Sequence, residues 1–240
     1  MTRWIFAPAG IVVMLWSGLA AQQPALPREL GIKYIRDSEE YATLARQTYR
    51  LAGEAVTRAA GAAGPWTVVL DIDETALDNS AYQLDRAAYG LPFDPLSWNA
   101  WVERREASAV PGVVDFVRLV RGATGHVAWI SNREVVSADA TRANLRTAGL
   151  WNDDDRLCLQ KTPEHTKGER RKEVVGGTGD CAWPATPMRV VVFVGDQLGD
   201  FPESAEQIPQ TGTDAAFGRT CFLLPNSMYG AWTTRVTRVR

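Results

Sequence analysis

The chain of 240 residues has only two histidines, His126 and His165, and three cysteines, and no cysteines stand at zinc-finger spacing. This scarcity argues against a metal site built from cysteine and histidine. Net charge is nearly absent too, because 26 lysines and arginines face 28 aspartates and glutamates. The protein therefore lacks the overall positive field that attracts nucleic acid or an anionic membrane. Repeats and low-complexity tracts are also missing, and a composition of 45% hydrophobic and 22% charged residues is typical of one globular domain.

Residues 1–20 are not expected to belong to that domain. Arg3 precedes an apolar stretch over residues 4–16, and small residues follow it. This order is typical of a secretory signal peptide, with cleavage after Ala20 and a single mature domain over residues 21–240. The alternative, an uncleaved anchor, is disfavoured because the apolar run is short and because Pro8, Gly10 and Gly18 weaken a long helix. No cysteine follows the run, so we expect a periplasmic or secreted protein that is not a lipoprotein and has no membrane span after cleavage.

Short apolar runs alternate with helical stretches along the mature chain. An N-terminal helix is expected to start at an Asp37 cap and to fade at the glycines and proline of residues 61–65. Pro111 is expected to open a later helix. The predicted strands are 66–70, 126–130, 156–159, 189–194 and 220–224, and the helices between them are 98–106, 111–121, 135–148, 164–175 and 202–208. This alternation predicts a three-layer, Rossmannoid α/β fold with a mostly parallel sheet of about five strands.

The three cysteines allow one disulfide in an oxidising compartment. Cys158 lies in the third predicted strand, and Cys181 lies in a long insertion over residues 176–187 that a crosslink could pin. We therefore expect a Cys158–Cys181 disulfide, with Cys221 as a buried thiol in an apolar strand.

Polar residues cluster where three of the predicted strands end. The first strand runs into DIDET at 71–75, the second into SNR at 131–133, and the fourth into GDQLGD at 195–200. In an open α/β sheet, ligands bind beyond the carboxyl ends of the strands where the strand order reverses. Four ionised aspartates in one cleft would repel one another, and a divalent cation with oxygen ligands, such as Mg²⁺, relieves that repulsion. Each motif alone is common in turns, but together they predict one shared site.

The motif stretches VVLDIDET, WISNR and VFVGDQLGDF, with a lysine between the last two, resemble the haloacid-dehalogenase (HAD) superfamily of phosphohydrolases. The flanking stretches are more specific: DETALDNSAYQ, LPFDPLSWNAWVERREASAVPGVVDFV and LLPNSMYGAWT resemble the class C non-specific acid phosphatases, which include the lipoprotein-e type. The resemblance runs from about Leu30 to Trp232. It implies a HAD-like fold with an N-terminal helical extension and a small helical specificity insert over about residues 78–106.

The resemblance also assigns roles to the acidic residues. It implies that Asp71 is the nucleophile, which forms an aspartyl-phosphate, and that Asp73 protonates the leaving oxygen and then activates water. Magnesium would be held by the Asp71 carboxylate, the Asp73 backbone carbonyl and Asp196, with Asp200 acting on it through a water molecule or from behind the direct ligands.

The phosphoryl oxygens would be bound by Ser131, Asn132 and a lysine. The family has Ser-x-Lys before a helix. Lys167 fits this pattern best because an arginine follows as in the family, although one residue is inserted and His165 replaces the serine. Lys161 is the alternative.

Substrate binding is implied for Phe93, Trp98 and Tyr229, which match aromatic residues that stack a flat ring in the family; the alternative is core packing. Stacking tolerates different bases, which implies phosphomonoester substrates that include nucleoside 5′-monophosphates, with 5′-nucleotidase activity.

We expect a Mg²⁺-dependent acid phosphatase. The alternatives are a catalytically weak binding or storage protein of the same fold, or a phosphotransferase to alcohols. The sequence leaves the oligomeric state open, a homodimer included.

Overall fold

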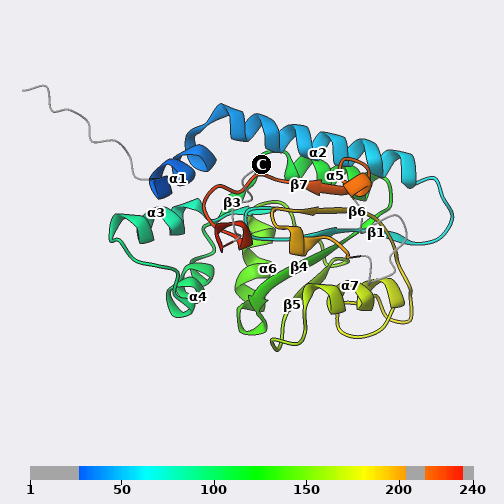
Figure 1. Cartoon of the computed structure of the whole chain (residues 1–240). Coiled ribbons are helices and arrows are strands. Elements are labelled where there is room, and N and C mark those ends of the chain that lie inside the picture. The colour runs from blue at the N-terminus through cyan, green and yellow to red at the C-terminus, as the bar shows by residue number, and fades with distance from the viewer. Residues whose placement is uncertain (1–26, 204–213, 235–240) are drawn as a thin grey trace, which may run out of the picture.

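The computed structural model in Figure 1 describes residues 27–203 and 214–234. Its centre is a parallel sheet with the strand order β5-β4-β1-β6-β7. These strands are β1 (Trp66–Leu70), β4 (His126–Glu134), β5 (Arg156–Gln160), β6 (Arg189–Gly195) and β7 (Cys221–Leu223). The chain adds β4 and β5 on one side of β1 and then β6 and β7 on the other. The strand order therefore reverses at β1, and the predicted five-stranded parallel sheet is confirmed.

Helices cover both faces of the sheet, because the central strands are apolar nearly throughout and so bury side chains on both sides. Val68 and Leu70 of β1 face a core formed with α2 (Glu39–Ala59), α5 (Val113–Gly122) and α6 (Ala138–Thr147). Val69 faces the opposite core, to which α7 (Lys167–Gly176) contributes Val174. Figure 1 shows α2 and α5 on one side of the sheet and α7 on the other. Three layers result.

The N-terminal helical region differs in detail from the prediction. It consists of α1 (Pro27–Asp37) and α2, so Asp37 ends a helix and does not cap one. Ser38 is the cap of α2, and its hydroxyl accepts a hydrogen bond from the Tyr41 backbone N–H at 3.1 Å. A polar cap of this kind accepts a hydrogen bond from one of the first backbone N–H groups of the helix, which have no partner within the helix itself.

The start of α5 is set by a contact with α2. Pro111 was expected to open this helix, but Gly112 is the N-cap and the helix begins at Val113. Gly112 has a φ of +95°, and a Cβ at this position would lie 3.0 Å from the Cα of Arg46 in α2. Glycine is required here by both the backbone conformation and the close packing.

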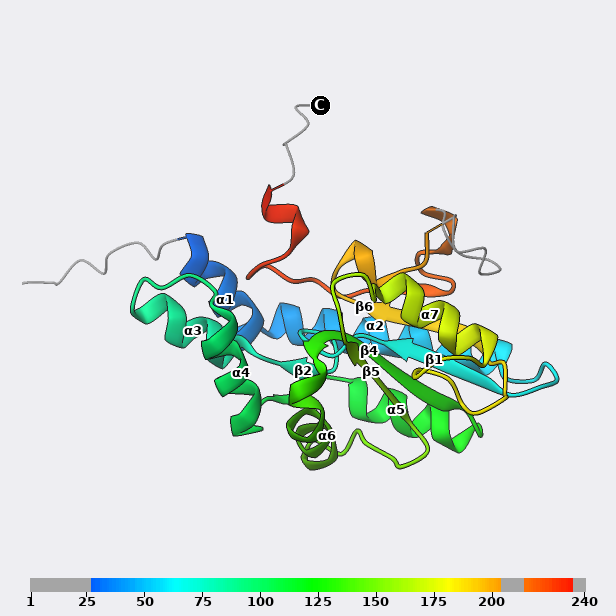
Figure 2. The ribbon, with the colours of Figure 1, turned by 90° about the horizontal axis from the view of Figure 1, so that it is seen from below.

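A helical insert follows β1, where the sequence suggested one. It contains α3 (Ser80–Ala88) and α4 (Pro95–Arg104), between the short antiparallel strands β2 (Leu77–Asp78) and β3 (Ser108–Ala109). Asp94 caps α4 by accepting from the Ser97 N–H at 2.8 Å. Figure 2 shows α3 beside α1, with α4 at the same end of the molecule. Short 3₁₀ turns also occur in the described residues, at Val135–Ser137, Leu198–Asp200, Asp214–Ala216 and Ala231–Thr234.

All three cysteines are buried free thiols, so the expected Cys158–Cys181 disulfide is absent from the structure. The predicted signal peptide and most of the predicted helix over residues 202–208 lie outside the described residues. Among the helices of the described ranges, none is both long and apolar enough to cross a membrane.

One buried hydrogen bond ties α2 to the loop after β1. The Tyr49 hydroxyl donates to the backbone carbonyl of Thr75 at 2.6 Å, and Tyr49 is only 2% exposed. We predict that Tyr49→Phe lowers the free energy of unfolding by about 1–3 kcal/mol, because it leaves a buried carbonyl without its donor. Urea unfolding would measure this, with Tyr89→Phe, an exposed tyrosine of the same chain, as the control. Equal stability of the two variants would contradict the prediction.

Candidate functional site

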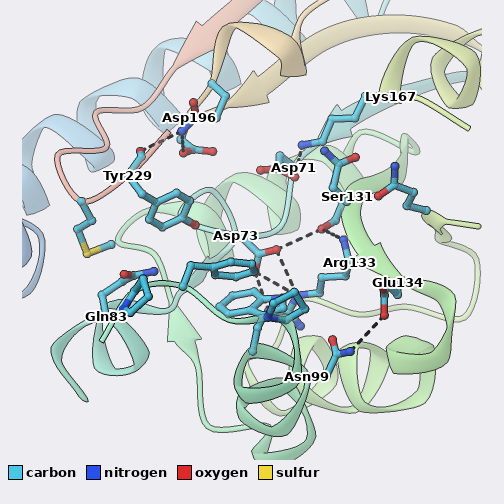
Figure 3. Close-up of a pocket in the computed structure, with 18 of the residues that line it drawn as sticks. Asp71, Asp73, Gln83, Asn99, Ser131, Arg133, Glu134, Lys167, Asp196 and Tyr229 are labelled. Carbon is cyan, nitrogen blue, oxygen red and sulfur yellow. Dashed lines mark hydrogen bonds and ion pairs between the residues drawn. The ribbon is translucent and has the colours of Figure 1, made fainter. Parts of the chain in front are cut away.

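A cavity of about 660 Å³ opens at the carboxyl ends of the central strands, between the sheet, the insert and the C-terminal segment (Figure 3). Nine of the ten residues singled out from the sequence line it: Asp71, Asp73, Phe93, Trp98, Ser131, Asn132, Lys167, Asp196 and Tyr229. The tenth, Asp200, is buried next to this wall and contacts Lys167. The parallel topology explains the convergence, because β1, β4 and β6 are neighbours whose carboxyl ends share one edge.

Three of the aspartates form a compact buried group. Carboxylate oxygens of Asp71, Asp196 and Asp200 lie within 4.8 Å of one another, and each residue is at most 7% exposed. Burial, reinforced by the neighbouring Asp200, raises the pKa of Asp196 to about 6. Burial also raises the pKa of Asp71 above its ordinary value, against the opposing effect of Lys167. A group of oxygen ligands whose negative charge is this poorly solvated suits a hard divalent cation.

Lys167 is the cation that joins this group. Its Nζ donates to Asp71 Oδ1 at 2.6 Å and to Asp200 Oδ1 at 2.5 Å. Burial alone would lower the pKa of Lys167, but the two carboxylates raise it above its ordinary value, so the ammonium stays charged. Lys167 is the first residue of α7, where the Thr166 hydroxyl caps the helix. Lys161, the alternative, is instead half exposed and paired with Asp180.

The Asp73 carboxylate does not join the acidic group but is held separately. Arg133 donates to Asp73 Oδ1 from Nη2 at 2.8 Å and from Nε at 3.0 Å. Asn79 Nδ2 donates to the same oxygen at 3.0 Å, and Ser131 Oγ donates to Oδ2 at 3.2 Å. Arg133 is 3% exposed and also donates to the Thr141 hydroxyl. These contacts fix the position of a carboxylate that faces the cavity.

Arg133 and Arg170 are structural parts of the site that the sequence reading missed. Arg170 is fully buried and donates to the Ser131 backbone carbonyl and to Asn132 Oδ1, both at 2.5 Å. Because the Asn132 carbonyl is engaged in this way, its NH₂ group is the donor left for a ligand. Arg133 is part of the SNR motif and Arg170 is the arginine that follows Lys167, but no structural role was expected of either, since an arginine is by default expected in solvent.

Two further polar side chains hold Asp196 in place. Asn226 Nδ2 and Gln197 Nε2 each donate to Asp196 Oδ2 at 2.8 Å. Asn226 belongs to the C-terminal LLPNSMYGAWT stretch, so this segment carries a residue that orients the acidic group as well as Tyr229. The Thr75 hydroxyl donates to the other carboxylate oxygen, Asp196 Oδ1, at 3.4 Å.

The predicted aromatic residues lie at the mouth of the cavity. Phe93 and Trp98 come from the insert, with ring centroids 6.2 Å apart, and both pack edge-on or tilted near Tyr82. Phe93 is 60% exposed. Tyr229 reaches the cavity from the C-terminal segment (Figure 3). Trp101, by contrast, is a core residue whose indole N–H donates to Asn79 Oδ1 at 2.9 Å.

Comparisons with known proteins agree with this geometry. A family described as HAD superfamily, subfamily IIIB (Acid phosphatase) matches residues 20–232. The class C acid phosphatase of Bacillus anthracis is 29% identical, with a TM-score of 0.71 over 85% of this chain and 86% of that one. Its structure with tungstate bound is 28% identical, with a TM-score of 0.70 over the same shares.

A plant protein is similar as well. Acid phosphatase 1 of Solanum lycopersicum is 29% identical over 168 residues, which are 67% of this chain. The chain spans only 57% of the length of that relative. The predicted resemblance to class C acid phosphatases is confirmed by the family match over most of the chain and by the shared fold. The chain belongs to subfamily IIIB of the HAD superfamily, the acid phosphatase subfamily.

Proposed function

We propose that the protein is an exported, Mg²⁺-dependent acid phosphatase that hydrolyses phosphomonoesters, nucleoside 5′-monophosphates among them. The observation that carries this proposal is the bridge from Lys167 to Asp71 and Asp200 at the edge of an open cavity. It brings together a carboxylate nucleophile, a site for a cation and a fixed positive charge for phosphate. The related Bacillus anthracis protein is described with tungstate bound, and tungstate is a tetrahedral oxyanion like phosphate.

The buried acidic group provides the proposed metal ligands. Asp71 and Asp196 would hold Mg²⁺ together with the Asp73 backbone carbonyl, and Asp200 would act on it from farther away while it pairs with Lys167. A bound magnesium ion neutralises charge on the nucleophile and on the phosphate and so favours their approach.

Asp71 is the proposed nucleophile. One of its carboxylate oxygens forms a bond to phosphorus as the bond from phosphorus to the leaving oxygen breaks, which gives an aspartyl-phosphate and an alcohol. Lys167, Ser131 and the Asn132 NH₂ group would bind the phosphoryl oxygens and stabilise the charge that develops on them. Water then attacks phosphorus, restores the Asp71 carboxylate and releases inorganic phosphate.

Asp73 is the proposed acid and base for the two halves of the reaction. It would give a proton to the leaving oxygen in the first step and take one from water in the second. Its contacts with Arg133, Asn79 and Ser131 support this role, because they hold the carboxylate at the cavity wall, apart from the buried acidic group.

Export and ring recognition rest on different parts of the chain. Export rests on the predicted signal peptide over residues 1–20, and the family match begins where that segment ends. Ring recognition rests on Phe93, Trp98 and Tyr229 at the cavity mouth, where a flat leaving group would lie while its phosphate points toward Lys167.

The first prediction concerns the metal. Chelation with EDTA should abolish turnover of a phosphomonoester, and added Mg²⁺ should restore it, because Lys167 alone compensates three buried carboxylates incompletely. Asp196→Asn should raise the Mg²⁺ concentration needed for half-maximal rate, whereas Asp139→Asn, an exposed aspartate on α6, should not. Full activity in a thoroughly chelated sample would overturn the proposed metal dependence.

The second prediction concerns the nucleophile. Asp71→Asn should lower kcat by roughly 10⁴-fold or more while the fold is kept, since an amide of equal size does not attack phosphorus. Circular dichroism and thermal unfolding would establish that the variant is folded. Turnover at the wild-type rate would show that another residue is the nucleophile, and equal, negligible turnover of both proteins would favour the binding or storage alternative.

The third prediction separates ring stacking from core packing at Trp98. Trp98→Ala should lower kcat/KM for a nucleoside monophosphate by an amount that corresponds to about 1–3 kcal/mol of lost transition-state stabilisation. It should lower kcat/KM for a small aliphatic phosphate much less, because that substrate has no ring to stack. Leu96→Ala, an exposed position on the same helix, is the matched control. An unchanged ratio between the two substrates, together with a lower melting temperature, would mean that Trp98 serves the core and would contradict ring stacking.

A further inference from the structure

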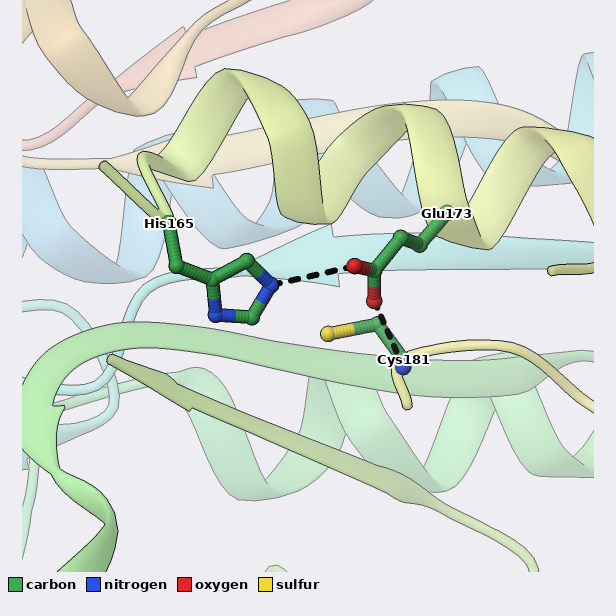
Figure 4. A group of neighbouring side chains, drawn as sticks. All are labelled: His165, Glu173 and Cys181. Carbon is green, nitrogen blue, oxygen red and sulfur yellow. Dashed lines mark hydrogen bonds and ion pairs between the residues drawn. The ribbon is translucent and has the colours of Figure 1, made fainter. Parts of the chain in front are cut away.

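Three residues of types that bind metals come together at α7, and none of them lines the cavity. His165 precedes the helix, Glu173 lies on it, and Cys181 follows it (Figure 4). A ring nitrogen, a carboxylate oxygen and the thiol of these residues lie within 4.8 Å of one another. His165 Nε2 is 3.1 Å from Glu173 Oε1, and the Cys181 backbone N–H donates to Glu173 Oε2 at 3.0 Å. The proposed phosphatase mechanism uses none of these three side chains.

A fourth potential ligand comes from the sheet. Cys158 of β5 belongs to the same buried apolar cluster as Cys181, and the two residues are 2% and 1% exposed. The hydrogen bond between the Cys181 and Cys158 thiols, together with burial, raises the pKa of Cys181. The Cys158 thiol therefore lies next to the Cys181 thiol, which belongs to the group with His165 and Glu173. These residues are few and do not follow zinc-finger spacing, so the sequence alone argued against a metal site of cysteine and histidine.

His165 has an unsatisfied atom in this group. Its Nδ1 is buried and has no hydrogen-bond partner among the described residues, and its side chain is only 15% exposed. An imidazole that makes one hydrogen bond, to Glu173, can turn toward a metal with the loss of that bond alone. A buried polar atom without a partner is costly, so its presence on a ring that is grouped with a thiol and a carboxylate points to a missing ligand.

We propose that Cys158, His165, Glu173 and Cys181 bind one Zn²⁺ ion, which fastens the two ends of α7 to β5. Tetrahedral zinc has bonds of about 2.0–2.3 Å, so its ligand atoms lie roughly 3.5 Å apart. The ligand atoms of His165, Glu173 and Cys181 already lie within 4.8 Å of one another, so small side-chain movements would bring them to this spacing, and Cys158, next to Cys181, would supply the fourth ligand. Thiolate and imidazole ligands select zinc over magnesium, which distinguishes this site from the acidic group in the cavity.

The charges of the proposed site balance. On binding, the two thiols release their protons to solvent, and the two thiolates and Glu173 carry three negative charges against the two positive charges of zinc. The remaining negative charge faces Arg170, which is fully buried, donates to the Cys158 carbonyl at 3.0 Å and interacts electrostatically with both cysteines. The guanidinium thus compensates the site from the side of the sheet.

Cobalt(II) binding tests the proposal directly, because thiolate ligands give Co²⁺ a charge-transfer absorption that oxygen ligands do not. The full mature chain, reduced and saturated with Mg²⁺, should bind one equivalent of Co²⁺ with this band, and Zn²⁺ should abolish the band by displacement. Cys181→Ser should remove the band and weaken Zn²⁺ binding at least about a hundredfold. His165→Ala, at the edge of the group, should also weaken Zn²⁺ binding and serves if Cys181→Ser fails to fold.

Two controls separate this site from other metal binding. Cys221→Ser removes a buried thiol from β7 and should leave the band intact. Asp196→Asn disturbs the acidic group and should also leave it intact, so that a failure of the proposed phosphatase site and of the zinc site can be told apart. Absence of the band in the wild type, or its persistence in Cys181→Ser, would overturn the proposal. So would one free thiol instead of three in the purified, unreduced and denatured protein, because a Cys158–Cys181 disulfide would use both sulfur ligands.

Discussion

The structure depends on how negative charge is accommodated at the carboxyl edge of the sheet. Asp71 and Asp196 end neighbouring strands, and Asp200 follows one turn later, so the topology itself forces three carboxylates into a space from which water is largely excluded. Such an arrangement is unfavourable unless positive charge enters it. The start of α7 delivers Lys167 to this point, and the same unmet charge makes the edge a place for a metal ion and a phosphate group.

A supporting layer of polar contacts keeps the carboxylates where they can act. Arg133 and Asn79 hold the Asp73 carboxylate, and Trp101 donates to the Asn79 side chain, which links the insert to the loop after β1. On the other side of that loop, the Tyr49 hydroxyl from α2 binds the backbone carbonyl of Thr75. The loop that carries both proposed catalytic aspartates is therefore held from two helical regions. Preorganisation of this kind allows charge to be stabilised without rearrangement during the reaction.

The strands and the site could be predicted from the sequence because their signals are local. Short apolar runs mark the five strands, and the polar motifs stand directly at strand ends, so a parallel topology is enough to bring them together. What could not be predicted depends on contacts between distant segments. The start of α5 follows from packing of Gly112 against α2, and the roles of Arg133 and Arg170 follow from burial. The grouping of His165 with Glu173 and Cys181 left no signal in the sequence spacing.

The central claim is that the buried aspartate next to Lys167 becomes covalently phosphorylated during turnover. Rapid acid quenching of the enzyme with a phosphomonoester labelled in its phosphoryl group, followed by digestion and peptide mapping, tests this most directly. The account predicts Mg²⁺-dependent label on the peptide that contains Asp71. Label on a different residue, or active turnover without any covalent label at the shortest quench times, would contradict it.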